Sequence, residues 1–275
     1  MPAATALATA SRPQRALSGR TAIVTGSTSG IGLGIAEALA ERGANVVLNG
    51  FGQCDEIRNL SSRLMDEHDV EILYSPADMS RPERIAEMVT AAADQFGQVD
   101  ILVNNAGIQH VAALEEFPAE KWDAILAINL SAAFHTTRSV IAGMKERRWG
   151  RIVNIASAHG LIASPFKAAY VAAKHGILGL TKVTALEAAE FGVTCNAVCP
   201  GYVWTPLVEK QIEGQAGTHG IPRDQVIRDV LLKQQPNKRF ATVEEIGAFV
   251  AFLCLQEAQS ITGSALPIDG GWTAH

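Results

Sequence analysis

Seven short apolar runs, separated by longer amphipathic stretches, constrain the fold of this chain more than any other feature. The runs are 21–25, 45–49, 71–75, 100–104, 151–157, 193–199 and 265–271. Stretches with helical periodicity lie between them, at 31–43, up to 64, 81–96, 122–147, 168–190 and 242–255. This alternation predicts an α/β fold with a seven-stranded, doubly wound parallel sheet. Because the runs are continuously apolar, we expect helices on both faces of the sheet.

Length and composition limit the class of protein. The 275 residues suit one large domain, and a hydrophobic fraction of 48% with 19% charged residues excludes a disordered chain. The net charge of −5 disfavours an extended nucleic-acid-binding surface. The cysteines at 54, 195, 199 and 254 lack the spacing of a zinc site, so we expect reduced thiols and no metal. No apolar run reaches the roughly eighteen residues of a membrane span, and we expect a soluble, cytoplasmic protein.

Two parts of the chain depart from the strand and helix rhythm. Residues 1–17 contain no acid and are rich in Ala, Thr and Ser, which predicts a flexible N-terminal extension, although an organellar presequence has a similar composition. Residues 18–275 would then form a single domain. The polar segment 205–240 is longer than most connections in compact domains, and such segments tend to be functional. We expect a substrate lid there, with a helix at 226–234.

A glycine-rich segment joins the first strand to the first helix. Gly26, Gly30 and Gly32 permit a tight turn and close approach of backbone N–H groups to a pyrophosphate, and the helix dipole favours the same anion. The spacing is G-x-x-x-G-x-G, which differs from the commoner G-x-G-x-x-G pattern. A purely structural bend is the alternative, but a turn placed between a strand and a helix predicts a dinucleotide site.

Residues 157–174 contain side chains that are suited to proton transfer. Tyr170 and Lys174 are four residues apart and would share one face of a helix, so the ammonium group can lower the pKa of the phenol from about 10. A tyrosinate can then act as a general base. Ser157 ends the preceding strand, where its hydroxyl can hydrogen-bond a reacting oxygen. For this spacing alone, a solvated lysine beside a half-buried tyrosine is the ordinary alternative.

Several separated motifs recur in the order typical of one enzyme family. They are TGSTSGIG at 25–32, NNAG at 104–107, Asn129, Ser157, Tyr170-x-x-x-Lys174 and CPG at 199–201. Over about 18–273 the chain resembles the short-chain dehydrogenases/reductases. The resemblance implies a Rossmann domain and a catalytic set of Asn129, Ser157, Tyr170 and Lys174, with Asn129 anchoring a proton-relay water. It also implies a homotetramer, in which the long helices at 121–146 and 168–190 could pair between subunits.

The same resemblance implies which residues contact a nicotinamide dinucleotide. They are Gly26, Thr28, Gly30, Ile31, Gly32, Phe51, Asp78, Met79, Asn105, Ala106, Gly107, Tyr170, Lys174, Pro200, Val203 and Thr205. Asp78 is the expected contact to adenine, whereas Asn105 either contacts the cofactor or braces the sheet. No Lys or Arg occurs at 21–41 or 43–57, so a 2′-phosphate has no obvious counterion and we expect NAD as the cofactor. The acid that usually binds the ribose is missing, and Phe51 would fill space instead.

Within this family, four segments resemble the bacterial D-3-hydroxybutyrate dehydrogenases: NGFG at 49–52, NNAGIQHV at 104–111, EEFPAEKWDAI at 115–125 and the closing DGGWTA. That resemblance implies NAD-dependent oxidation of (R)-3-hydroxybutyrate, a small hydroxy acid, to acetoacetate. It implies substrate contacts from Gln109, Ser157, His159, Lys167, Tyr170, Tyr202, Gln211 and Trp272. Among them, Gln109, His159, Lys167 and Gln211 would hold the carboxylate.

Other functions remain open on this pattern. Tyr202 stands where the family commonly has Trp, which leaves the accepted acid chain length open. One alternative is another short-chain enzyme, such as a 3-oxoacyl thioester or sugar reductase. A second alternative is a non-catalytic dinucleotide-sensing protein, because a fold does not determine a function.

Overall fold

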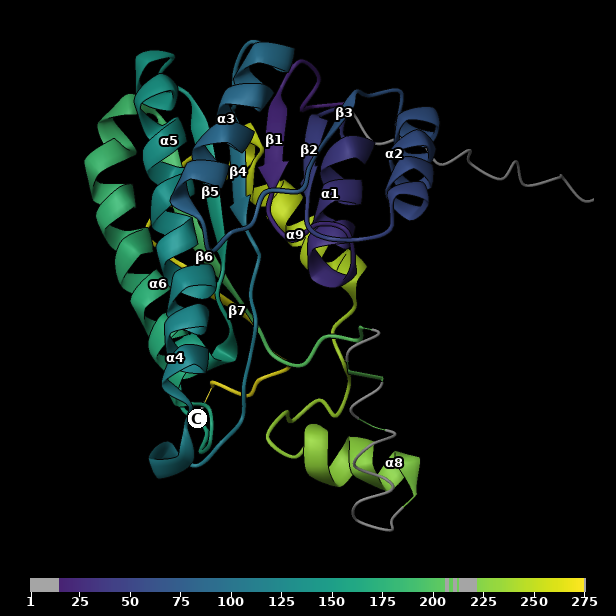
Figure 1. Cartoon of the computed structure of the whole chain (residues 1–275), viewed down its shortest axis with the longest axis vertical. Helices are drawn as coiled ribbons and strands as arrows, with labels where there is room; N and C mark the ends of the chain where they lie inside the picture. The colour runs from purple at the N-terminus through teal and green to yellow at the C-terminus, as the bar shows by residue number, and fades with distance from the viewer. Residues whose placement is uncertain (1–14, 206–207, 210–211, 213–221, 275) are drawn as a thin grey trace, which may run out of the picture.

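The computed structural model describes residues 15–205, 208–209, 212 and 222–274. Seven strands form one sheet (Figure 1): β1 (Thr21–Val24), β2 (Asn45–Asn49), β3 (Ile72–Ser75), β4 (Ile101–Asn104), β5 (Gly150–Ile155), β6 (Val193–Pro200) and β7 (Ala265–Ile268). Every pairing is parallel, and the strand order is β3-β2-β1-β4-β5-β6-β7. The predicted seven-stranded, doubly wound sheet is therefore confirmed.

The helices of the described residues cover both faces of the sheet. They are α1 (Gly30–Glu41), α2 (Cys54–His68), α3 (Pro82–Phe96), α4 (Ala119–Leu126), α5 (Ala132–Glu146), α6 (Ala168–Ala188), α8 (Arg223–Gln225) and α9 (Val243–Leu253). Buried residues of α1, α2 and α9 pack with strand residues in one core cluster. Buried residues of α3, α5 and α6 pack with strand residues in a second cluster. This two-sided covering explains why the strand runs are continuously apolar.

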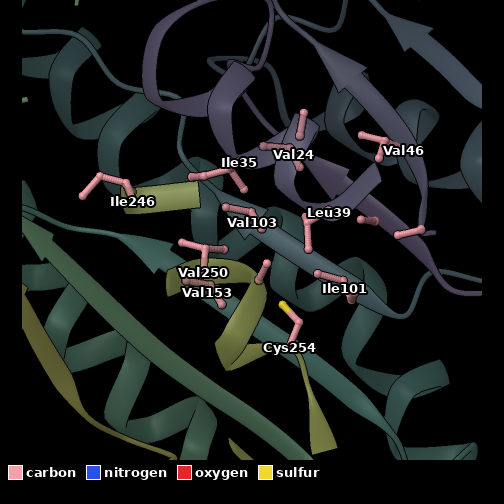
Figure 2. Packing of buried hydrophobic residues seen from close by; sticks show 14 of the residues in the cluster. Val24, Ile35, Leu39, Val46, Ile101, Val103, Val153, Ile246, Val250 and Cys254 are labelled. Carbon is pink, nitrogen blue, oxygen red and sulfur yellow. The ribbon is translucent and has the colours of Figure 1, made fainter. Parts of the chain in front are cut away.

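Neighbouring strand residues point to opposite layers. Val24 and Val103 pack with Ile35 of α1 and Val250 of α9 (Figure 2). Ile23 and Leu102, the residues directly before those two valines, pack instead with Met88 of α3 and Met144 of α5. Side chains alternate across a strand, so each central strand supplies both cores. The result is a rigid sheet whose carboxyl edge can hold a site in place.

The long helix predicted at 122–147 contains an irregular turn. α4 and α5 are joined without a break by η2, a π-helical turn at Ala127–Ser131. A π turn accommodates one extra residue in a helix, and such turns are frequent at functional sites. The apolar periodicity of the sequence predicted one continuous helix here and did not reveal the π turn. Asn129 lies in this turn and is buried.

The connection between β6 and α9 is held closed at its base. Residue Val203 pairs with Ala241 in a parallel bridge, and two backbone hydrogen bonds, from Trp204 to Ala241 and from Ala241 to Tyr202, measure 2.8 and 3.0 Å. Helical structure runs from α8 into η5 (Val226–Leu231), where the sequence predicted a helix at 226–234. The two ends of the expected lid are therefore adjacent, whereas its residues 206–207, 210–211 and 213–221 lie outside the described part of the chain.

The packed structure begins before residue 18. Leu17 is buried in the core beside α1, and its N–H donates to the carbonyl oxygen of Arg42 at 2.9 Å. Arg15 forms an ion pair with Asp69 at 3.0 Å. Residues 15–17 therefore differ from the predicted flexible extension, since packing against α1 and an ion pair anchor them. The remainder of that extension, residues 1–14, is outside the described residues.

Three findings concern the described residues as a set. Each of their helices is too short or too polar to cross a lipid bilayer. They contain no group of three His, Cys, Asp or Glu side chains that could hold a metal ion. All four cysteines are free thiols: Cys54 is exposed, while Cys195, Cys199 and Cys254 are buried.

Candidate active site

A cleft of about 620 Å³ lies along the carboxyl edge of the sheet. It is bordered by residues that follow five of the strands, namely Gly26, Phe51, Asp78, Asn105 and Ser157, and by Tyr170 and Lys174 of α6. The sheet order reverses between β1 and β4, and open α/β sheets bind ligands at such a point. The cleft therefore occupies the expected place for a dinucleotide.

The glycine turn shapes one wall of the cleft. Gly26 has a φ of 63°, a left-handed conformation that favours glycine. A side chain at Gly32 would overlap the carbonyl oxygen of Gly26 and the amide of Asn105. Ser29 directly precedes α1, and its side chain makes no capping hydrogen bond to the helix. The backbone N–H groups of the first helical turn are therefore left for another partner. These features fit a pyrophosphate, and the turn could hold that part of a dinucleotide.

Two asparagines brace this wall. The Asn49 side chain accepts from the Gly26 N–H at 3.1 Å and donates to the carbonyl oxygens of Ser75 and Ala77 at 3.1 and 2.9 Å. The Asn105 amide donates to the carbonyl oxygens of Thr25 and Gly26 at 2.9 and 3.0 Å. The side chain of Asn105 thus braces the sheet, although the residue also borders the cleft.

Asn49 was not among the site residues predicted from the sequence, although its position in the sequence indicates a role at the site. It is a polar residue at the end of a buried strand, at the edge where sites form, and it is only 1% exposed. Its three hydrogen bonds tie the ends of β1, β2 and β3 together. The position of the glycine turn depends on these contacts.

The cleft extends past β2 and β3. Phe51 borders it and is 71% exposed. Its carbonyl oxygen accepts from the Thr28 hydroxyl at 3.2 Å, and the carbonyl oxygen of Gly50 accepts from the Tyr74 hydroxyl at 2.9 Å. Hydrogen bonds from Ser80 lower the pKa of Asp78, which keeps that carboxylate charged. Thr28, Ile31, Met79, Ala106 and Gly107, for which the family resemblance implies cofactor contacts, also border the cleft.

Ser157, Tyr170 and Lys174 meet at the other part of the cleft. β5 ends two residues before Ser157, and α6 presents Tyr170 and Lys174 one turn apart. The Lys174 ammonium nitrogen lies 5.6 Å from the centroid of the Tyr170 ring and donates to the carbonyl oxygen of Ile155 at 2.7 Å. The fold therefore brings together the three side chains that the sequence assigned to proton transfer.

Burial controls the proton affinities of this group. Burial raises the pKa of Tyr170 above its ordinary value, and a hydrogen bond with Ser157 acts in the opposite direction. Burial also lowers the pKa of Lys174 to about 8. The expected lowering of the Tyr170 pKa by Lys174 is therefore not what this structure shows. Desolvation of the phenol dominates here, and the ammonium group is directed to the carbonyl of Ile155.

Asn129 lies behind this group, in the π turn. Its side-chain oxygen accepts from the N–H of Ile108 at 2.9 Å, and its amide donates to the carbonyl oxygen of the same residue at 2.9 Å. Asn129 and Lys174 also border a separate small cavity of about 10 Å³. A polar cavity of this size has room for about one water molecule.

His159 and two aromatic residues surround the Tyr170 side of the site. The His159 ring packs edge-on against Tyr170 and Trp272, with centroid distances of 6.1 and 5.2 Å. Trp272 stacks on Tyr202 at 5.7 Å. Burial, together with the positive charges of Lys167 and His175, lowers the pKa of His159 to about 4, so its ring is neutral at pH 7.

The other predicted substrate and cofactor residues are placed as follows. Gln109, Pro200 and Thr205 border the cleft. Lys167 directly precedes α6, and burial lowers its pKa. Val203 does not border the cleft, because its side chain is buried in the core beside α1 and α9. Gln211 lies outside the described residues.

Comparisons with known proteins agree with this geometry. Residues 26–273 match a family profile described as enoyl-(acyl carrier protein) reductase. The chain is 59% identical to a D-beta-hydroxybutyrate dehydrogenase of Rhizobium meliloti (strain 1021), over 93% of this chain and 99% of the relative. It is 55% identical to a D-beta-hydroxybutyrate dehydrogenase of Cupriavidus necator, over 94% of this chain and 100% of the relative.

A solved structure shares the fold. The crystal structure from Sinorhizobium meliloti 1021 that carries the description of short-chain alcohol dehydrogenase superposes with a TM-score of 0.84 at 34% identity. The match covers 95% of this chain and 99% of that chain. On the profile match, the sequence identities and this superposition, the chain belongs to the short-chain dehydrogenase/reductase family.

Proposed function

We propose that the protein catalyses the reversible, NAD-dependent oxidation of (R)-3-hydroxybutyrate to acetoacetate. The observation that carries the proposal is the convergence of Ser157, Tyr170 and Lys174 in a cleft that also contains a glycine turn suited to a pyrophosphate. Two relatives that match nearly the whole chain are D-beta-hydroxybutyrate dehydrogenases, which supports this substrate.

In the proposed reaction the substrate loses a proton and a hydride. A bound nicotinamide supplies the hydride-accepting chemistry. In its tyrosinate form, Tyr170 takes the proton from the C3 hydroxyl, and Ser157 orients the same oxygen, so that the C3–O bond becomes the carbonyl of acetoacetate. Lys174, with a pKa of about 8, is mostly protonated at pH 7 and holds a positive charge beside the tyrosine.

Proton release from Tyr170 requires a path from the cleft to solvent. The small cavity beside Asn129 and Lys174 has room for about one water molecule. We assign that water, the Lys174 ammonium group and Asn129 to a relay. The π turn supports this role, because it alters the backbone hydrogen bonding around Asn129.

Recognition of the acid depends on its carboxylate. Lys167 supplies a positive charge close to His159, and Gln109 borders the cleft. Hydrogen bonds to charged groups contribute about 1.5–3 kcal/mol each, so several donors together can select a small anion. We include Gln211 in this set on the family resemblance alone. Trp272 and Tyr202 stack on each other beside His159, and we propose that this aromatic pair limits the length of the acid.

We propose NAD as the cofactor. Phe51, Gly50 and Asn49 border the end of the cleft where a ribose hydroxyl or 2′-phosphate would lie, and none carries a charge. A 2′-phosphate would lose hydration there without gaining a cation. The hydrogen bonds from Thr28 and Tyr74 to this segment hold its backbone in place for a neutral ribose.

We further propose that residues 18–275 form one domain and that the segment 205–240 is a lid that closes over bound substrate. We also propose that the protein is cytoplasmic and that four copies assemble into a homotetramer. Phe134 of α5 and Val183 and Leu186 of α6 are 47%, 53% and 82% exposed, which supports pairing of these helices between subunits. The buried free thiols suit a reducing compartment. Light scattering of the purified protein measures the assembly mass, and a monomer at micromolar concentration contradicts the tetramer.

The function is tested by initial rates with a panel of alcohols and both dinucleotides. We expect the highest kcat/KM with (R)-3-hydroxybutyrate and NAD. The methyl ester and 2-butanol lack the carboxylate, and a site that loses such a partner discriminates by roughly 10⁴-fold or more. Equal efficiency with the acid and its ester contradicts the proposed substrate, and equal efficiency with NADP contradicts the proposed cofactor.

A further inference from the structure

The connection between β5 and α6 places two serine hydroxyls beside the two nitrogens of one imidazole ring. The Nε2 atom of His159 lies 2.8 Å from the hydroxyl oxygen of Ser164, and Nδ1 lies 3.5 Å from that of Ser157. The backbone N–H of His159 also donates to the Ser157 hydroxyl at 3.2 Å. His159 therefore links Ser157 to Ser164, a residue to which the sequence assigned no role.

The His159 ring has little freedom to change partners. It is 5% exposed and packs edge-on against Tyr170 and Trp272. A buried nitrogen that loses its hydrogen-bond partner cannot turn to bulk water, and such a loss is costly. The Ser164 hydroxyl is therefore the group that determines how the Nε2 edge of this ring is held.

The chemistry of the pair suits a neutral ring. Burial and the charges of Lys167 and His175 keep His159 uncharged, so the ring has one N–H and one lone pair. A serine hydroxyl can donate or accept a hydrogen bond, and Ser164 can satisfy Nε2 in either tautomer. The ring can therefore adopt the tautomer that suits Ser157, and neither of its nitrogens is left without a hydrogen-bond partner.

The segment that carries Ser164 is itself anchored. Phe166 has a φ of 66°, which is rare for a residue with a large side chain. Its carbonyl oxygen accepts from the N–H of Ala112 at 3.0 Å, which joins this segment to the one that contains Gln109. The strained residue is held by the surrounding structure, and Ser164 is held two residues before it.

We propose that Ser164 is a positioning residue for the oxidation described above, on which this inference rests. Ser164 holds the His159 ring, and the ring holds the Ser157 hydroxyl in the orientation in which it meets the reacting oxygen. Ser164 itself does not contact the reacting atoms. Loss of its hydroxyl therefore slows turnover without weakening cofactor binding.

The first test compares Ser164→Ala with Ser164→Thr. We expect Ser164→Ala to lower kcat for (R)-3-hydroxybutyrate about tenfold, because a misplaced Ser157 acts mainly on the transition state. Ser164→Thr keeps the hydroxyl and should restore kcat to within about threefold of wild type. The Kd for NADH, from fluorescence titration, should stay within about twofold in both variants. Ser61→Ala is the matched control, since that half-buried hydroxyl donates to the Ile57 carbonyl at 2.9 Å, away from the cleft.

The pH profile separates positioning from stability. A hydrogen bond with Ser157 lowers the pKa of Tyr170, which is also faced by Lys174 of its own helix and by the neutral His159. Lys167 and His175 act on His159 in turn. With Ser157 loosened, the pH at which oxidation reaches half its maximum should rise by about half a unit. If Ser164 is purely structural, Ser164→Ala lowers the melting temperature and leaves the pH of half-maximal oxidation unchanged.

The outcomes are distinct. The proposal is supported if Ser164→Ala lowers kcat and raises the pH of half-maximal oxidation, and if Ser164→Thr restores both. The proposal is overturned if Ser164→Ala keeps the wild-type kcat and the wild-type pH of half-maximal oxidation. It is also overturned if Ser164→Ala and Ser164→Thr lower kcat equally. A wild-type enzyme that oxidises a different alcohol and not 3-hydroxybutyrate contradicts the proposed substrate instead, and the same comparison is then made with that alcohol.

Discussion

The hydroxyl of Tyr170 is the single atom on which the proposed chemistry depends. Phe at this position preserves the ring contact with His159 but removes the proton acceptor. General base catalysis contributes about 10²–10⁴-fold, so Tyr170→Phe should lower kcat by that range. NADH binding, measured by fluorescence titration, should remain close to wild type. Near-normal turnover in a correctly folded variant would remove Tyr170 from the mechanism.

Lys167 offers a test of carboxylate recognition at the same scale. Loss of a charge-assisted hydrogen bond costs about 1.5–3 kcal/mol, so Lys167→Ala should lower kcat/KM for 3-hydroxybutyrate by about 10–100-fold, mainly through KM. The methyl ester should be affected far less. Lys182→Ala is the control, because Lys182 is an exposed lysine of α6, the helix that Lys167 directly precedes. Equal losses for acid and ester would contradict the assignment.

At the scale of elements, α1 is held against α9, and α1 carries the glycine turn. α9 begins with a capping box: the Thr242 hydroxyl accepts from the Glu245 N–H at 3.2 Å, and the Glu245 carboxylate accepts from the Thr242 N–H at 2.8 Å. Thr242→Ala should lower the free energy of unfolding by about 0.5–2 kcal/mol. Urea denaturation measures it, with Ser139→Ala on exposed α5 surface as the control. An unchanged midpoint would show that the cap contributes nothing.

For the whole molecule, His159 couples stability to pH. Its pKa is about 4 in the folded protein and about 6.5 in an unfolded chain, so the unfolded state binds more protons between these values. Stability should therefore fall as the pH decreases from 6.5 to 4, by at most about 3–4 kcal/mol. The corresponding window for Lys174, whose pKa is lowered to about 8, lies above that pH. Urea titrations of wild type and His159→Asn across pH 4–7 measure the effect, and parallel curves would contradict it.

The main features of the fold and the placement of Tyr170 beside Lys174 could be predicted from local sequence. Each apolar run contains a strand, because burial on both faces favours apolar side chains. Tyr170 and Lys174 share a helix face because that spacing is one helical turn. The glycine turn was visible in the sequence because a side chain at Gly32, which borders the cleft, would overlap the backbone of Gly26. In each case the cause lies within a few residues of the chain.

Tertiary contacts decided the rest. The three hydrogen bonds of Asn49, the pairing of Ser164 with His159 and the burial of Val203 away from the cleft join residues that local patterns do not connect. The proton affinities of Tyr170 and His159 follow from desolvation, which exists only once the surrounding elements have packed. The sequence by itself therefore determined which elements form and which reactive groups they carry. Only the packed structure decided how those groups are held and charged, because both depend on neighbours distant in the chain.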